Sequence, residues 1–196
     1  MTTAATQATG ERVDAILRAA CAVVVSDGAH ELRMGTVAER AGVSKALVHY
    51  YFSTRQALLR AAFAFAEDQR ERALEEELDA LSSGAERVER VLVRAIGPDT
   101  SDSPALWNEV WSSLRSDPEL RPLVQERYRA WAERIVRLLT EGQEDGSVPR
   151  RVDTSDAGWT LAAIADGLES ILYLGLLDLE RARCLLADAF ARELDS

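Results

Sequence analysis

The sequence predicts an all-α fold of about nine helices. Apolar residues recur at helical spacing between glycines and prolines, and no stretch shows the alternation of apolar and polar residues that a strand requires. With 196 residues, of which 47% are hydrophobic, the chain is long enough to bury a sizeable core. No apolar run reaches the ~18 to 20 residues of a membrane-spanning helix, and the first ten residues do not resemble a signal peptide. We therefore expect a cytoplasmic protein that does not span a membrane.

The chain begins with a short polar segment and two helices. Residues 1–9 are expected to form a disordered arm. A first helix over residues 11–27 carries its apolar side chains on one face and ends at Gly28, a residue suited to the left-handed turn after a helix. A short second helix, "RMGTVAERAG", is closed in the same way by Gly42.

Hydroxyl side chains mark the starts of the next two helices. Ser44 is placed to cap a third helix of about two turns that ends at Tyr51. Ser53 or Thr54 caps a long fourth helix over residues 55–81. The same apolar periodicity predicts five further helices, over residues 85–97, 104–116, 118–142, 156–177 and 179–194.

Charge is distributed unevenly along the chain. The formal net charge is −10, yet residues 1–58 hold six basic and five acidic side chains, while the rest holds 17 basic and 28 acidic ones. DNA affinity depends largely on cations placed against phosphates, and an acidic surface repels a polyanion. Only the near-neutral N-terminal part is therefore expected to approach nucleic acid.

The second and third helices have the dimensions of a helix-turn-helix. In this motif the second helix enters the major groove while the first crosses the backbone. The joining segment "AGVS" supplies the small Ala41 and the turn residue Gly42, and Val48 can hold the recognition helix on the core. The N-terminus of that helix favours an anion, and Lys45, the only lysine in the chain, adds a cation there.

The stretch "AGVSKALVHYYFSTRQAL" resembles the DNA-binding motif of the TetR family of transcriptional repressors, over roughly residues 12–59. The resemblance implies a helix-turn-helix domain over residues 10–56 and a helical effector-binding and dimerisation domain over residues 57–196. It also implies a double-stranded DNA operator as partner, with base edges and phosphates contacted by different side chains. Lys45, Ala46, Leu47 and Tyr50 would face base edges, and Thr36, Ser44, His49, Tyr51 and Arg55 would lie near phosphates.

Several of these positions depart from the family pattern. His49 stands where the family usually has Tyr, Tyr51 where it has His, and Arg55 where it commonly has Lys. Ala46 and Leu47 replace a small and polar pair, so we expect an operator different from those of the relatives. The aromatic cluster could instead serve the core, which is the interpretation adopted for Phe52, and a partly buried structural role for His49 stays open.

The C-terminal part, "WNEVWSSLRSDPELRPLVQERYRAWAERIVRLLTEGQEDG" followed by "ADGLES", is similar to the BetI-type subgroup of TetR regulators. The family resemblance implies a homodimer formed through the last two helices and a small-molecule effector held between the middle ones. A palindromic operator would then present half-sites roughly 34 to 36 Å apart. Effector binding would release a repressor of this kind from its operator.

Aromatic and acidic residues suggest which effector fits. Aromatic pairs occur at helical spacing, and such faces can hold a cation or a flat apolar ligand. A carboxylate turned inward would supply the opposite charge, so the hypothesis is a cationic or lipophilic amine-like effector. Core packing is the alternative for the same aromatic side chains. The candidate residues are Trp107, Trp111, Tyr128, Trp131, Asp166 and Glu169.

Enzyme chemistry has no support in the sequence. There is no nucleophile with a base, no metal-spaced set of His, Cys and carboxylate residues, and no glycine-rich phosphate loop, so neither a metal nor a cofactor is expected. Cys21 and Cys184 are single thiols in apolar helical contexts, which favours buried, inert cysteines. The remaining alternative is a helical small-molecule carrier or interaction module without sequence-specific DNA binding.

Overall fold

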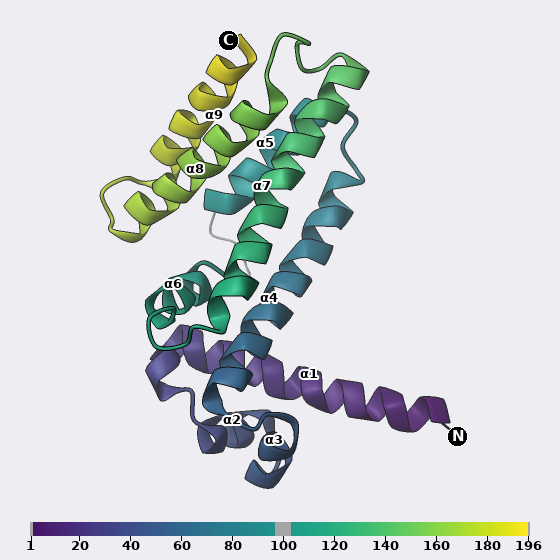
Figure 1. The fold of residues 1–196 in the computed structure, drawn as a ribbon, viewed down its shortest axis with the longest axis vertical. Helices are drawn as coiled ribbons and strands as arrows, with labels where there is room; N and C mark the ends of the chain where they lie inside the picture. Colours follow the sequence, from purple (N-terminus) through teal and green to yellow (C-terminus); the bar gives the residue numbers. More distant parts are fainter. Residues whose placement is uncertain (1, 97–102, 196) are drawn as a thin grey trace. The chain divides into compact units, whose positions relative to one another are not determined.

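The computed structural model describes residues 2–96 and 103–195. This part of the chain is built from helices without a strand (Figure 1), so the all-α prediction is confirmed. None of the described helices is long and apolar enough to cross a membrane. The elements are α1 (Thr2–Asp27), a single 3-10 turn η1 (Ala29–Glu31), α2 (Met34–Ala41), α3 (Lys45–Tyr51), α4 (Arg55–Leu78), α5 (Gly84–Ile96), α6 (Ser103–Ser113), α7 (Leu120–Asp145), α8 (Thr154–Tyr173) and α9 (Leu179–Asp195).

Local capping explains where the N-terminal helices begin and end. The Ser44 hydroxyl accepts a hydrogen bond from the Leu47 N–H at 3.2 Å and caps α3, as the sequence predicts. Thr54 plays the same part for α4. Gly42 closes α2 with a φ of 67°, in the left-handed region that favours glycine. α1 begins at Thr2, inside the segment 1–9 for which the sequence predicts a disordered arm.

The chain divides into two compact units. The first unit comprises Met1–Glu71 with Thr100–Val124, and the second comprises Arg72–Asp99 with Gln125–Ser196. The helices α4 and α7 therefore each contribute residues to both units. The domain boundaries at residues 10 and 57 follow from the helix-turn-helix motif in the sequence, and they remain predictions.

One hydrophobic core holds the first unit together. Ile16 and Val23 of α1 are fully buried with Val48 of α3, and Leu106 and Val110 of α6 belong to the same cluster. Burial of such aliphatic side chains contributes about 1.5 to 3 kcal/mol each. The helix α6, which sequence reasoning placed in the C-terminal domain, thus shares its core with the helix-turn-helix.

The second unit is packed around close helix crossings. A Cβ on Gly84 of α5 would lie 2.3 Å from the backbone nitrogen of Gly142 in α7, so only glycine permits this approach. Next to the crossing, the exposed Asp145 carboxylate accepts hydrogen bonds from the backbone N–H of Gly84 at 2.7 Å and of Ser147 at 2.8 Å. Hydrogen bonding from the Ser147 hydroxyl, and then from these two backbone groups, lowers the pKa of Asp145.

The two cysteines differ in exposure. Cys21 is buried and its Sγ lies 3.3 Å from the Ala62 carbonyl oxygen, as expected for an inert core thiol. The same expectation is wrong for Cys184, which is exposed. α9 buries Ala182 and Leu186, and Cys184 lies on the other side of that narrow stripe.

Candidate DNA-binding and effector sites

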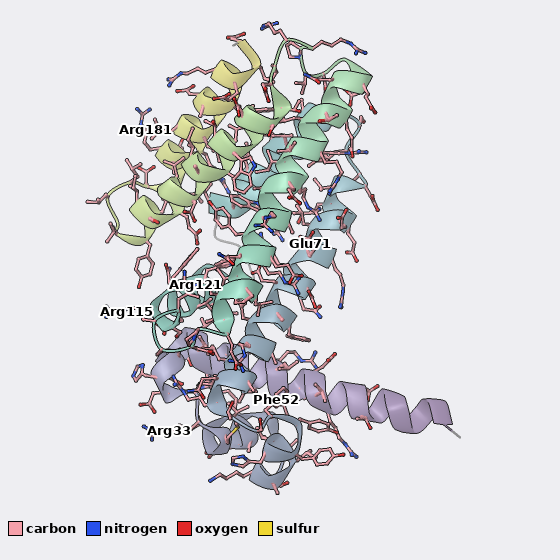
Figure 2. All side chains as sticks on the ribbon, viewed as in Figure 1. Arg33, Phe52, Glu71, Arg115, Arg121 and Arg181 are labelled. Atoms are coloured by element: carbon pink, nitrogen blue, oxygen red, sulfur yellow. The ribbon has the colours of Figure 1, made fainter. Side chains whose placement is uncertain are left out.

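The recognition helix α3 is held by one face and exposed on the other. Val48 is fully buried and Phe52, which follows the helix (Figure 2), is nearly so, and both belong to the core of the first unit. The core role expected for Phe52 is therefore observed. Tyr51 is partly buried against the same core. Because the buried face of α3 packs on the core, its outer face is available to contact a partner.

The outer face of α3 carries most of the residues expected at base edges. Lys45, Ala46 and Tyr50 are exposed, and Leu47 is half-buried. His49, expected near a phosphate, is exposed as well, so the partly buried role left open for it is wrong. Tyr50 is 80% exposed although it is a large aromatic residue, and its ring meets Tyr51 edge to face at 5.1 Å. An exposed tyrosine in the last turn of α3, with Lys45 exposed in the first turn, suits contact with a polar, partly apolar surface such as a DNA groove.

The residues expected near phosphates lie in three different settings. Ser44 is exposed at the N-terminus of α3, and Thr36 is half-buried in the first turn of α2. Arg55 is exposed at the start of α4, but its Nη2 donates a hydrogen bond to the Ala29 carbonyl oxygen. Sequence reasoning did not single out Arg33, an exposed guanidinium at the N-cap of α2 that pairs with Glu31 at 3.2 Å. The sequence feature that could have indicated Arg33 is its place as a basic residue directly before the first helix of the motif.

The six residues predicted for the effector fall into different units. In the first unit, the Trp107 ring meets Phe63 edge to face at 4.8 Å and lies 5.8 Å from the Trp111 ring. Its Nε1–H donates a 2.9 Å hydrogen bond to Glu67, which is 5% exposed and paired with Arg70 at 3.1 Å. The carboxylate beside Trp107 is therefore already neutralised. Trp107 is partly buried against the core of the first unit and its N–H is satisfied, a setting that agrees with the core-packing alternative.

The second unit brings together the other aromatic pair and a carboxylate. The rings of Tyr128 and Trp131, both on α7, meet edge to face at 5.5 Å. Asp166 on α8 is half-buried, and burial raises its pKa. Burial and then the charge of Asp166 raise the pKa of Tyr128, which means that the two side chains are close enough to interact. Glu169, one turn further along α8, is also half-buried.

The Asp166 carboxylate has no cationic partner among the described residues. A half-buried anion without a counter-charge is unfavourable, because burial removes part of its hydration. The ring of Tyr128, on which the charge of Asp166 acts, contacts the ring of Trp131, and electron-rich ring faces attract cations. This group, Tyr128, Trp131 and Asp166, is called the acidic aromatic cluster below. It can stabilise a small organic cation, and no group of residues suited to a metal ion occurs in the described chain.

Comparison with known proteins identifies the family of the chain. Residues 16–62 match the sequence model described as bacterial regulatory proteins of the tetR family, and residues 84–195 match the BetI-type transcriptional repressor C-terminal model. The HTH-type transcriptional regulator BetI of Escherichia coli O127:H6 is 32% identical over 145 residues, which cover 72% of this chain and 71% of the relative. The chain belongs to the TetR family. The predicted family, with its BetI-type C-terminal region, is confirmed.

Solved structures of transcriptional regulators extend the likeness over nearly the whole chain. A protein from Rhodococcus sp. assigned to the TetR family is 29% identical with a TM-score of 0.80, covering 94% of this chain and 99% of its own. A protein from Saccharomonospora viridis assigned as a transcriptional regulator was solved in complex with choline. It is 26% identical with a TM-score of 0.81 and covers 92% of this chain and 95% of its own.

Membership in the TetR family settles the class of function. The chain is a transcriptional regulator with a helix-turn-helix, and the prediction that it is not an enzyme is confirmed by its relatives. TetR regulators bind DNA, dimerise and bind small-molecule effectors. The alternative of a helical carrier or interaction module without a DNA-binding role is therefore wrong.

Proposed function

We propose that this TetR-family chain is a homodimeric repressor that a small organic cation of the quaternary ammonium type releases from a palindromic operator. The observation that carries the proposal is the half-buried Asp166 carboxylate, which lacks a cationic partner among the described residues and lies beside Tyr128. The site of action would be the cytoplasm, where the operator is found.

The exposed face of α3 would read the operator. Lys45, Ala46, Leu47 and Tyr50 would meet base edges in the major groove. Leu47 can meet a thymine methyl group but cannot donate a hydrogen bond. Contacts to phosphate would come from the N-termini of α2 and α3 and from nearby side chains, with Thr36, Ser44, His49 and Tyr51 as the candidates.

The last two helices would form the dimer interface. The solvent-facing stripe of α8 carries the small residues Ala163, Gly167 and Ser170 at helical spacing, with the exposed Trp159 one turn before them. At its end, Tyr173 and Leu174 are exposed although both are large and apolar. Small residues allow close helix approach, and exposed apolar side chains favour burial against a second copy. A two-fold partner would also present the two recognition helices to successive half-sites.

Charge complementarity favours a cationic effector at the acidic aromatic cluster. A cation next to Asp166 would restore the interactions that the carboxylate loses on burial, and the rings of Tyr128 and Trp131 would add cation–π attraction of about 0.5 to 2 kcal/mol. The choline complex of the Saccharomonospora viridis relative supports this ligand class. Glu169 is a second candidate for the charge contact. The pair Trp107 and Trp111 is less suited, because the carboxylate there is already paired with an arginine.

Release from DNA would follow from a population shift. A cation that binds better to a conformation with the wrong spacing of recognition helices lowers the fraction of dimer that fits the operator. The coupling is reciprocal, so operator DNA should weaken binding of the cation by the same factor.

The effector class can be tested with two ligands of nearly equal shape. Choline and its uncharged carbon isostere, in which a tert-butyl group replaces the trimethylammonium group, are titrated while tryptophan fluorescence is followed. We expect saturable binding of choline and at least about tenfold weaker binding of the isostere, because a partly buried charge pair is worth about 1.4 kcal/mol or more. Equal affinity for both would show that shape, and not charge, selects the ligand.

A further inference from the structure

Ala29, in the turn between α1 and α2, is bound by charged side chains at both of its peptide groups. Its N–H donates a 2.8 Å hydrogen bond to Oε2 of Glu109, which lies on α6. Its carbonyl oxygen accepts a hydrogen bond from Nη2 of Arg55, at the start of α4. Ala29 itself is only 3% exposed. We call this arrangement the Ala29 bracket.

The connection that the bracket holds has little regular structure of its own. Gly28 has a φ of 83°, a conformation open to glycine, and η1 is a single 3-10 turn. Buried backbone groups need hydrogen-bond partners, and the first N–H of a helical turn has none within the turn. Glu109 supplies that partner from 80 residues away. α6 also packs against α1 and η1 within the first unit.

We propose that Glu109 and Arg55 are positioning residues for DNA binding, and that Arg55 acts through Ala29 instead of through a phosphate. The bracket fixes the path of the chain into α2 and so sets the orientation in which α2 and α3 meet the operator. Nothing in the helix-turn-helix sequence itself indicates this dependence on α6. The inference rests on the proposed DNA binding of α3.

The expected effect is a change in the fraction of molecules that fit the operator. Apparent affinity falls in proportion to the fraction of competent conformers. Charge-assisted hydrogen bonds to a buried backbone group are among the stronger ones, and losing one is expected to reduce that fraction about tenfold. Because no phosphate contact is lost, the dependence of affinity on salt should stay unchanged.

A matched pair of substitutions isolates the hydrogen bond at Glu109. Glu109→Gln and Glu109→Met are both uncharged and similar in length, but only glutamine keeps an oxygen that accepts the Ala29 N–H. Operator affinity of the full-length dimer is measured by fluorescence anisotropy over a range of salt concentrations, using DNA selected by the wild type from random sequences. Glu126→Met, at an exposed position of α7, controls for the loss of a surface charge.

We expect Glu109→Met to bind about tenfold more weakly, Glu109→Gln to stay within about twofold of the wild type, and both to keep the wild-type salt slope. Wild-type affinity of Glu109→Met would overturn the proposal. Amide hydrogen exchange at Ala29 gives a second readout, since it should accelerate in the methionine variant only. Unchanged protection of Ala29 in that variant would equally refute the bracket.

Arg55→Met independently tests the second hydrogen bond of the Ala29 bracket, between Arg55 and the Ala29 carbonyl oxygen. We expect weaker operator binding with an unchanged salt slope, and less than additive loss when it is combined with Glu109→Met. A salt slope reduced by about 0.9 would instead make Arg55 a phosphate contact and overturn its assignment. Failure of the wild type to select any DNA would contradict the proposed function, which is distinguishable from failure of the variants alone.

Discussion

Replacing Asp166 with asparagine should separate effector binding from folding. The change keeps the size of the side chain and removes the charge that the acidic aromatic cluster offers to a cation. A pair of unit charges about 5 Å apart at an effective dielectric constant of about 20 is worth about 3 kcal/mol. Asp166 is only half-buried, and solvent screening reduces this value by about half. We therefore expect choline to bind about tenfold more weakly to Asp166→Asn.

Isothermal titration of choline and of its uncharged isostere into both proteins measures this effect. The isostere should bind equally to wild type and variant, since it carries no charge for Asp166 to attract. Asp79→Asn, the same change at an exposed position after α4, should leave both affinities unaltered. An unchanged choline affinity in Asp166→Asn would refute the assignment of the charge contact to Asp166.

The same substitution should raise thermal stability in the absence of ligand. Burial raises the pKa of Asp166, so its protonated form is favoured in the folded state. The contribution of this group to stability is fully present below the ordinary aspartate range and is lost as pH rises through the raised pKa. At neutral pH Asp166→Asn should unfold at a higher temperature than the wild type, and the difference should close in acid. Scanning calorimetry at several pH values tests the sign.

Four further changes test other parts of the structure. Lys45→Ala should weaken binding to every DNA sequence and reduce the salt slope by about 0.9, because Lys45 adds a cation at the N-terminus of α3, and an unchanged slope would leave Lys45 with base-edge contacts alone. Gly84→Ala should cost about 1 to 3 kcal/mol in denaturant titrations, because the new Cβ would lie 2.3 Å from the Gly142 nitrogen. A side chain at position 167 would enter open space within one chain, so Gly167→Leu should fold yet sediment as a monomer. A dimer would refute the packing of two subunits through α8. The pKa of Asp145 is lowered in the folded protein, so Asp145→Asn should be less stable than the wild type at neutral pH, and this difference should disappear as pH falls through that pKa. A stability difference that does not depend on pH would contradict this prediction.

Local features of the fold follow directly from the sequence. Apolar periodicity predicts each described helix, and Ser44 caps α3 because a serine before a helix can accept from the N–H groups of its first turn. The burial of Val48 and the exposure of Tyr50 follow from their positions on opposite sides of a short helix. These features depend only on residues a few positions apart.

Long-range contacts are what the sequence could not predict. Glu109 reaches Ala29 across 80 positions, and nothing in the surroundings of either residue indicates the partner. Similarly, the Trp107 N–H is satisfied by Glu67, 40 positions away. Which carboxylate remains without a cation depends on such pairings. The sequence proposed both aromatic pairs for the effector, and only the structure favours the one beside Asp166.

The coupling between cation and operator is tested most directly by measuring operator affinity with and without saturating choline. Fluorescence anisotropy with a palindromic DNA selected by the wild-type dimer gives both values, and choline titrations with and without that DNA give the reciprocal pair. We expect choline to weaken operator binding by at least about fivefold, and DNA to weaken choline binding by the same factor. Operator affinity that is identical in the presence and absence of choline would contradict a cation-released repressor.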